Sequence, residues 1–359
     1  MMDACVIVTW RCPFHCKMCS IWRHPSVAAE EFAPSVLEKL PRMNAVNITG
    51  GEPFEREDLE DIVRILAPRS RRIVFSTNGW YTERIVAMAR RFPQAGFRIS
   101  LEGLAEINDA LRGMPGGFER GMETLRQLQE LGCKDVGVAM TLSGTNQDDL
   151  LPLYRLAREK GWEFATAAAH NSFYFHKQDN VIANGAGVAS ALDGLVGCML
   201  AENSPKSWAR AYFNAGLKGF VLGQPRPLPC RAGSSNFFID PAANVLPCNG
   251  MAEAMVMGNL AEAASFEEIW ESARAWEVRA AVAACTRNCW MMGTASPAIK
   301  SHPMQVGAWI LKEQCGRLFG SPRKGGDSCE SASSCKGGAS CKSASPCEGA
   351  DSLEKEGSE

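Results

Sequence analysis

Short apolar runs alternate with helical spacing of apolar residues through the first half of the chain. The six apolar runs cover residues 5–9, 45–49, 72–76, 96–100, 136–142 and 163–168. Between them, apolar residues recur every three or four positions over residues 59–66, 85–92, 122–131 and 150–160. A strand followed by a helix, repeated along the chain, predicts parallel strands joined by right-handed crossovers. Because a closed barrel of this type has eight such units, we expect an α/β fold with a partial (β/α)6 TIM-like barrel. A doubly wound sheet is the alternative.

The second half of the chain follows a different pattern. Two short apolar runs flank a turn at residues 241–244, which predicts a β-hairpin. A helix is expected over residues 265–283, and Ser265 and Glu268 at its start can form a capping box. A last helix is expected over residues 302–317. We expect that helix to pack on the body of the protein through one apolar side, formed by Val306, Trp309 and Ile310.

Composition narrows the class of protein. The 359 residues are 46% hydrophobic, which is enough for a sizeable core, and the net charge of −2 gives no reason to expect a nucleic-acid partner. No apolar stretch approaches the roughly 20 residues that a membrane span needs, and no signal peptide is evident at the start, so we expect a cytoplasmic protein. Fifteen cysteines in a chain of this length indicate metal binding or chemistry rather than a disulfide scaffold.

The clearest chemical motif follows the first apolar run. Cys12, Cys16 and Cys19 have the spacing C-x3-C-x2-C. A cluster of four irons usually takes four thiolates, so three cysteines leave one iron open to a reactant such as the amino and carboxylate groups of S-adenosylmethionine. The competing hypothesis is a structural zinc site that adds His15 or His24. Zinc does not explain the polar motifs that follow the next three strands.

Those motifs come directly after the second, third and fourth predicted strands. They are Gly50-Gly51-Glu52-Pro53, Ser76-Thr77-Asn78-Gly79 and Ser100-Leu101-Glu102-Gly103. In barrels of this kind the carboxyl ends of the strands meet at one mouth, where the site forms. Together with the three cysteines, the motifs resemble the radical S-adenosylmethionine (radical SAM) superfamily over residues 4–180.

The resemblance implies a set of site residues. Cys12, Cys16 and Cys19 would hold a [4Fe–4S] cluster that reductively cleaves S-adenosylmethionine to a 5′-deoxyadenosyl radical. Gly50, Gly51 and Glu52 match the stretch that receives the methionyl amino group, through the carboxylate or backbone carbonyls. The match also places Met18 against the adenine and Asn78 as the polar residue after the third strand. It assigns Ser100 and Glu102 to the ribose and carboxylate contacts, and Arg112 to the methionyl carboxylate. Glu102 stands where aspartate is commoner, and Arg112 can equally be a surface arginine.

A second group of cysteines surrounds the predicted hairpin and helix. Its members are Cys230, Cys248, Cys285 and Cys289. Four thiolates suit one four-iron cluster, and a four-cysteine zinc site is the alternative. The pattern, with residues 265–270, resembles the twitch or SPASM-type auxiliary cluster domain, although cysteines for a second auxiliary cluster are lacking. Four protein ligands would leave no iron open to bind a substrate. The cluster is therefore expected to act as an electron acceptor. Cys315 is expected to be a free thiol, and a ligand from outside this group is the alternative.

The composition changes again from Ser321, where serine, glycine, alanine, lysine, glutamate and cysteine dominate. Such a segment cannot bury enough apolar surface to order itself, although Cys329, Cys335, Cys341 and Cys347 recur every six residues and could bind metal. The expected parts are a radical SAM barrel (1–190), a helical connection (191–228), a twitch/SPASM-like domain with a terminal helix (229–319) and a disordered tail (320–359).

The expected function is a radical SAM enzyme of the oxidoreductase type that modifies a sugar, a cyclitol or a peptide. A maturase of ribosomally synthesised peptides is the alternative, and a non-catalytic iron–sulfur or zinc protein is the alternative from another class. The barrel begins within a few residues of the start, which disfavours a leader-dependent maturase. The expected partners are an organic substrate and an electron donor such as flavodoxin or ferredoxin. Residues 170–176 are expected either to contact the substrate or to form an ordinary packed loop. The sequence does not single out a catalytic base.

Overall fold

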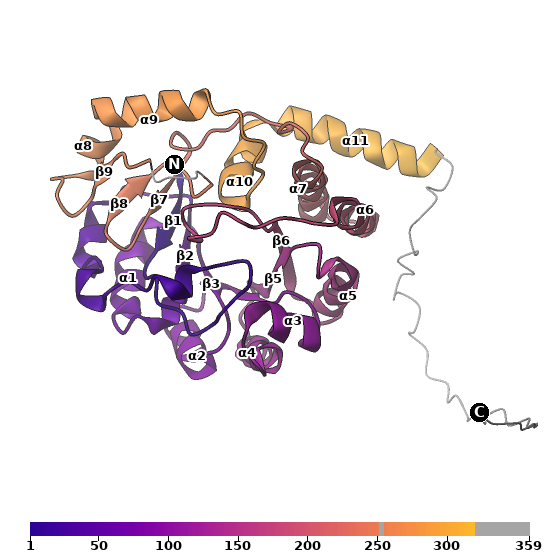
Figure 1. The fold of residues 1–359 in the computed structure, drawn as a ribbon, viewed down its shortest axis with the longest axis horizontal. Coiled ribbons are helices and arrows are strands. Elements are labelled where there is room, and N and C mark those ends of the chain that lie inside the picture. The colour runs from indigo at the N-terminus through magenta and orange to yellow at the C-terminus, as the bar shows by residue number, and fades with distance from the viewer. Residues whose placement is uncertain (251–254, 320–359) are drawn as a thin grey trace, which may run out of the picture. The chain divides into compact units, whose positions relative to one another are not determined.

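The computed structural model describes residues 1–250 and 255–319 (Figure 1). Its first six strands are parallel and lie in the sheet in the order of the sequence. They are β1 (Asp3–Ile7), β2 (Ala45–Thr49), β3 (Ile73–Thr77), β4 (Gly96–Ser100), β5 (Val136–Leu142) and β6 (Glu163–Ala168). Among the strands that the structure describes, β6 has β5 as its only neighbour and does not pair with β1. The sheet is therefore open between these two strands, which confirms the predicted partial barrel.

Two of the predicted strands are displaced along the chain. Strand β3 lies one residue after the predicted 72–76, whereas β1 lies two residues before the predicted 5–9. The chain leaves the sheet after Ile7 because its next polar groups find partners in a loop. The backbone N–H of Trp10 donates to Ser26 Oγ at 2.9 Å, and the Thr9 hydroxyl donates to Glu31.

The predicted hairpin extends the barrel sheet. Its strands β7 (Asn236–Ile239) and β8 (Asn244–Leu246) are antiparallel, and β9 (Gly258–Asn259) pairs with β8. Strand β7 is also hydrogen-bonded to β1 in parallel register, with Asp3 opposite Asn236, so the sheet has nine strands. The pairing covers the edge of β1, which would otherwise present unpaired N–H and C=O groups.

Helices cover the strands of the barrel. The predicted helices are present as α1 (Leu59–Leu66), α2 (Thr82–Arg91), α4 (Gly117–Glu130) and α5 (Leu150–Glu159). Each buries one apolar face, as in α1, where the buried residues are Leu59, Ile62, Val63 and Leu66. The sequence did not predict α3 (Ala105–Arg112), which is only eight residues long and ends at Gly113 in the left-handed conformation (φ 60°). Two of its three buried residues, Asn108 and Arg112, are polar, so α3 shows little apolar periodicity.

The helical connection consists of α6 (Gly185–Ala201) and α7 (Pro205–Val221), which contact each other. After the hairpin, the predicted helix over 265–283 is two helices, α8 (Phe266–Trp270) and α9 (Ala273–Ala283). The division lies at Ser272, whose hydroxyl accepts a hydrogen bond from Ala275 N and caps α9. Ser265 caps α8 through Glu268 N, but the Glu268 carboxylate accepts from Ala264 N rather than from Ser265 N. The capping box is therefore present in a modified form.

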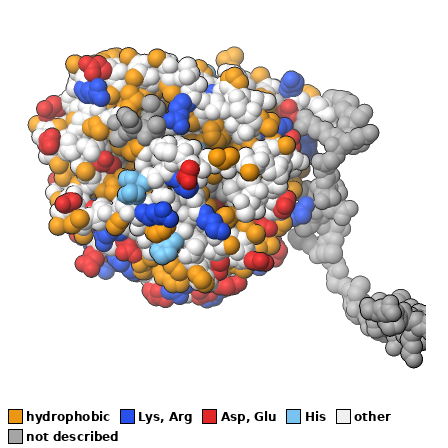
Figure 2. All heavy atoms as spheres, in the orientation of Figure 1, with side chains coloured by type: hydrophobic (Ala, Val, Ile, Leu, Met, Phe, Trp, Pro, Cys, Tyr) orange, Lys and Arg blue, Asp and Glu red, His pale blue; other side chains and the backbone are white. Residues whose placement is uncertain are grey.

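The described chain ends with α10 (Met292–Ser301), which was not predicted, and α11 (Pro303–Phe319). Val306 is buried, and Trp309 and Ile310 pack against the core, which confirms the predicted apolar side of α11. Among the described residues, no helix is long and apolar enough to cross a membrane. Figure 2 shows acidic and basic side chains interspersed over one face of the molecule. The tail cysteines lie outside the described residues.

Short 3-10 helices join several of these elements. They are η1 (Ile21–Arg23), η2 (Ala28–Glu30), η3 (Pro34–Lys39), η4 (Pro53–Glu55), η5 (Ala67–Arg69) and η6 (Gln147–Asp149). The most important for the site is η4, because it follows the glycine motif directly after β2 and so fixes where that motif ends.

Candidate functional site

The three N-terminal cysteines and the motifs after β2, β3 and β4 line one cavity of about 180 Å³. The predicted site residues in its wall are Cys12, Cys16, Met18, Cys19, Gly50, Gly51, Asn78, Ser100, Glu102 and Arg112. Of the residues predicted to contact the cofactor, Glu52 is not in the lining. Residues that the sequence did not single out also line the cavity, among them Phe14, Ile21, Trp22, Thr49 and Thr141.

The two glycines after β2 allow the cysteine loop to approach this strand closely. The N–H of Gly51 donates to Thr9 O at 2.8 Å, and that of Glu52 donates to Arg11 O at 2.8 Å. A Cβ atom on Gly50 would lie 2.5 Å from Thr9 O, and one on Gly51 would lie 2.3 Å from Arg11 O. Any other residue at these positions would push the cysteine loop away.

The Glu52 carboxylate connects the ends of β2 and β3. It accepts hydrogen bonds from the Thr77 hydroxyl at 2.7 Å, Asn78 N at 2.7 Å and Phe54 N at 3.2 Å. Burial raises the pKa of Glu52 to about 7, although the bonds from Asn78 and Thr77 oppose the rise. The carboxylate is engaged within the protein, so the backbone of Gly50 and Gly51 borders the cavity in its place.

Arg112 and Glu102 form a buried ion pair in the cavity wall. Arg112 Nη1 donates to Glu102 Oε1 at 2.8 Å, and Thr141 N donates to Glu102 Oε2 at 2.5 Å. The Arg112 guanidinium also lies 5.1 Å from the centre of the Phe14 ring. With 7% of its surface exposed, Arg112 is no surface arginine. It is carried by α3, the short helix that the sequence did not predict.

The charge of Arg112 acts on all three cysteines. Burial raises the pKa of the Cys12 and Cys16 thiols, and it raises that of Cys19 to about 12. Arg112 opposes the rise in each case. Because thiolates are the form that binds iron, a buried cation beside three half-buried thiols suits an anionic cluster at this place.

Two nitrogen atoms of this cavity wall are buried and have no hydrogen-bond partner in the part of the chain that the structure describes. They are Asn78 Nδ2 and Arg112 Nε, both hydrogen-bond donors. A buried donor without an acceptor costs roughly 1–3 kcal/mol, so an acceptor on a ligand would stabilise these atoms. The carboxylate and hydroxyl oxygens of S-adenosylmethionine are such acceptors. The three thiols, Arg112 and the unpartnered donors therefore fit a [4Fe–4S] cluster with S-adenosylmethionine.

The segment after β6 closes one side of the cavity. Tyr174 and Phe175 line it, and the Tyr174 hydroxyl donates to Gly50 O at 3.0 Å. Tyr174 also packs edge-on against Trp10, with ring centres 5.5 Å apart. The predicted segment 170–176 thus reaches the cavity, and its contact with a substrate remains a prediction.

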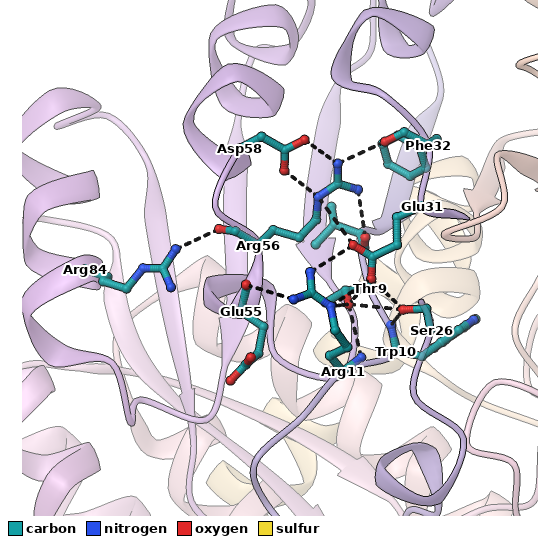
Figure 3. A network of polar contacts seen from close by, with 11 residues as sticks. Thr9, Trp10, Arg11, Ser26, Glu31, Phe32, Glu55, Arg56, Asp58 and Arg84 are labelled. Carbon is teal, nitrogen blue, oxygen red and sulfur yellow. Dashed lines mark hydrogen bonds and ion pairs between the residues drawn. The ribbon is translucent and has the colours of Figure 1, made fainter. Parts of the chain in front are cut away.

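A polar network holds the base of the cysteine loop (Figure 3). Its centre is Glu31, whose side chain is only 2% exposed. The carboxylate pairs with Arg11 at 2.9 Å and accepts from the Ser26 and Thr9 hydroxyls. Burial by itself raises the pKa of Glu31, but the hydrogen bonds from these three residues outweigh it, and the net pKa is lowered.

The neighbouring Arg56 extends this network to the strand end. It is buried and donates to Val8 O at 3.0 Å and Phe32 O at 2.9 Å, and it pairs with Asp58 at 2.6 Å. Arg11 Nη1 meanwhile donates to Glu55 O in η4 at 3.3 Å. These contacts join the residues just before Cys12 to the segment just after the glycine motif, so they fix the position of the cysteine loop over the cavity.

The second group of cysteines lies around the hairpin. Cys230 and Cys248 belong to a small apolar cluster that also contains Cys19, Tyr174 and Phe238. Burial raises the pKa of the Cys289 thiol; Arg226 opposes the rise, whereas nearby Cys230 and Cys285 add to it. Within residues 1–250 and 255–319, no three His, Cys, Asp or Glu side chains are arranged to hold one metal ion.

Two family models match the chain. The one described as the radical SAM superfamily matches residues 6–157, and the one described as an iron–sulfur cluster-binding domain (SPASM) matches residues 230–290. The matches contain the first and second groups of cysteines respectively.

Curated relatives include the mycofactocin maturase MftC of Mycolicibacterium smegmatis (strain ATCC 700084 / mc(2)155). It is 27% identical over 286 residues, which cover 75% of this chain and 71% of that protein. The Fe-coproporphyrin III synthase of Methanosarcina barkeri (strain Fusaro / DSM 804) is 35% identical, but over only 31% of this chain and 28% of that protein.

Solved structures share the fold. Native anSMEcpe with bound AdoMet and Cp18Cys peptide has a TM-score of 0.59 and 13% identity, and the match covers 87% of this chain and 99% of that one. Streptococcus suis SuiB bound to precursor peptide SuiA has a TM-score of 0.58 and 15% identity, with 83% and 74% covered. At these identities the likeness is one of fold.

Proposed function

Because the chain belongs to the radical SAM superfamily and has a SPASM-type iron–sulfur domain, we propose that it is a maturase that modifies a peptide. The similarity to a mycofactocin maturase over 75% of the chain carries this proposal. Two structures of similar fold are bound to peptides, which agrees with it. The sequence left a sugar, a cyclitol and a peptide open as substrates and gave the peptide maturase as the alternative, and the mycofactocin maturases among the relatives favour that alternative.

In this proposal the first cavity holds the cofactors. Cys12, Cys16 and Cys19 would bind the [4Fe–4S] cluster, and Asn78 and Arg112 would donate to oxygens of S-adenosylmethionine. When bound, the pair supplies a 5′-deoxyadenosyl radical that abstracts a hydrogen atom from the substrate. Arg112 offsets the negative charge of the thiolates, and Tyr174 with Phe175 shields the cavity on the side of the β6 loop.

The second group of cysteines would hold the auxiliary centre. Cys230, Cys248, Cys285 and Cys289 supply four thiolates, which completes a four-iron cluster without an open position. Phe238 and Tyr174 lie in the apolar cluster that contains Cys19, Cys230 and Cys248. This arrangement suits an electron acceptor close to the first cavity. The protein should therefore contain about eight irons per chain after anaerobic reconstitution.

The function is tested with the reconstituted protein, a strong reductant, S-adenosylmethionine and short peptides encoded beside its gene. We expect 5′-deoxyadenosine to form together with a change in the mass of one peptide, and Cys16→Ala to lose both. Changing Cys285 and Cys289 together to Ala should retain 5′-deoxyadenosine but lose the modified peptide. Turnover of a porphyrin or sugar, with no peptide modified, would contradict the proposal.

A further inference from the structure

A second cavity, of about 350 Å³, lies beside the first. Among the described residues, four segments line it: the loop after β6, the end of α7, Gly250 after the hairpin, and the loop that carries Cys285 and Cys289. Cys289 belongs to the lining, whereas Cys230, Cys248 and Cys285 do not. The cavity is thus adjacent to the second group of cysteines rather than enclosed by it, and the proposed function assigns it no role.

His170 lines this cavity and has a buried ring nitrogen without a partner among the described residues. Its Nδ1 lies 2.9 Å from Ala168 O. A carbonyl oxygen can only accept, so Nδ1 carries the hydrogen and Nε2 carries a lone pair. Nε2 is buried and has no hydrogen-bond partner in the described part of the chain. A ligand with an N–H group would satisfy it.

Arg287 presents a cation to the same cavity. Its side chain is exposed and makes no ion pair or hydrogen bond to any described residue, and no carboxylate is among the lining residues. The nearby Arg226 differs, because it donates to Leu228 O and Cys289 O and lies 5.2 Å from the Trp290 ring centre. Arg226 therefore holds the cysteine loop, whereas Arg287, whose charge also opposes the rise in the pKa of Cys289, has no hydrogen-bond or ion-pair partner among the described residues and can bind an anion.

The two cavities share a wall. His170 packs edge-on against Phe175, with ring centres 5.0 Å apart, and Phe175 lines the first cavity. Asn180 lines the second cavity and donates to Met18 O and His170 O, both at 3.0 Å. A chain bound in the second cavity would therefore lie next to the site where hydrogen abstraction is proposed.

We propose that the second cavity binds a carboxylate-bearing segment of the peptide substrate, with a backbone N–H donated to His170 Nε2 and the carboxylate held by Arg287. The hydrogen-bond acceptor of His170 and the cation of Arg287 line the same cavity. Together they match the N–H and carboxylate of one acidic or C-terminal amino-acid unit. The inference rests on the proposed function, because it takes the substrate to be a peptide.

Binding of three acetylated tripeptides to the reconstituted protein tests this, by anaerobic titration calorimetry. The probes are trialanine with a free carboxyl terminus, alanine–aspartate–alanine amide and trialanine amide. We expect one carboxylate probe to bind about tenfold more tightly than trialanine amide, equivalent to about 1.4 kcal/mol. Tighter binding of trialanine with a free carboxyl terminus would indicate that the cavity recognises a C-terminal carboxylate. Tighter binding of alanine–aspartate–alanine amide would indicate that it recognises an acidic side chain. Equal affinity for all three probes would overturn the inference.

Variants separate ligand binding from support of the cluster. Arg287→Gln should remove the preference for carboxylate and Arg287→Lys should retain part of it, with iron content unchanged. Arg231→Gln is the matched control, because it removes an exposed arginine beside Cys230 that does not line the cavity. His170→Phe should lower the affinity of the protein for all three tripeptides by a similar factor. Loss of iron in Arg287→Gln but not in Arg231→Gln would overturn the inference. Peptide turnover is measured separately, so failure here leaves the maturase proposal standing.

Discussion

At the scale of single residues, the first cavity is defined by polar groups that the protein leaves without partners. Asn78 illustrates this, because its Oδ1 accepts from Trp80 N at 2.9 Å while its Nδ2 has no acceptor among the described residues. One half of the amide shapes the turn after β3, and the other half is left for a ligand.

Asn78→Asp separates these two roles. The Trp80 N–H keeps its acceptor, so the fold should be unchanged, but the donor to the cofactor is lost. We expect the dissociation constant for S-adenosylmethionine to rise about tenfold or more, since a hydrogen bond to a charged group contributes roughly 1.5–3 kcal/mol. Equilibrium dialysis of the reconstituted variant measures this. An unchanged constant would remove Asn78 from the proposed cofactor contacts.

Glu31 is the residue on which the network under the cysteine loop depends. Glu31→Gln keeps an acceptor for the hydroxyls of Thr9 and Ser26 but removes the charge that Arg11 faces. We expect the free energy of unfolding to fall by about 2 kcal/mol at pH 7, as measured by urea denaturation. Glu30→Gln is the control, because Glu30 is exposed, and it should cost almost nothing.

The effect of Glu31 depends on pH with a definite sign. Its pKa is lowered in the folded protein, so its contribution is present above the unfolded pKa of about 4.3. The contribution disappears as the pH falls through the lower folded pKa. The difference between wild type and Glu31→Gln should therefore shrink below about pH 4. A difference that stays constant on acidification would show that the charge of Glu31 is not what stabilises the loop.

At the scale of elements, β7 is the strand that joins the two halves of the site. Its neighbouring residues point to opposite faces of the sheet. Phe237 packs against Phe266 and Trp270, with ring centres 4.8 and 5.9 Å apart. Phe238 lies instead in the apolar cluster with Cys19 and Cys230.

This alternation predicts different consequences for two similar substitutions. Phe237→Ala and Phe238→Ala should each lower the free energy of unfolding by about 3–5 kcal/mol. Only Phe238→Ala should also change the midpoint potentials of the iron–sulfur centres, because water then reaches the cluster side of the sheet. Redox titrations followed by electron paramagnetic resonance measure this. Equal shifts of the midpoint potentials in both variants would indicate that either substitution loosens the structure around the sheet.

At the scale of the whole molecule, the sheet runs through both matched domains. Strand β1 lies between β2 and β7, so the barrel has no free edge on that side while the hairpin is present. Helix α10 also contacts β1 and β7. The SPASM region is therefore part of the same hydrogen-bonded framework as the radical SAM region.

A chain that ends at residue 228 should consequently fail to fold as a soluble barrel, because it exposes the edge of β1 and the apolar surface under the hairpin. A chain that ends at residue 319 should keep its iron content and its cleavage of S-adenosylmethionine. Size-exclusion chromatography and circular dichroism test the first, and iron analysis tests the second. A monomeric, folded 1–228 fragment would show that the two regions are independent.

The sequence by itself determined the six barrel strands, the hairpin, most of the helices and the motifs that meet at the first cavity, but not β9. These features are local: an apolar period covers a few residues, and C-x3-C-x2-C lies within one loop. The carboxyl ends of successive parallel strands then bring the motifs together without further information.

Only the tertiary structure decided which groups pair across long separations. Glu52 faces Thr77 and Asn78 instead of the cavity, Arg112 is buried against Glu102, and β7 adds to β1. Each depends on the burial of a polar group or strand edge that must find a partner somewhere in the fold. The sequence shows that such groups exist, but their partners are set by how the strands, helices and loops pack together.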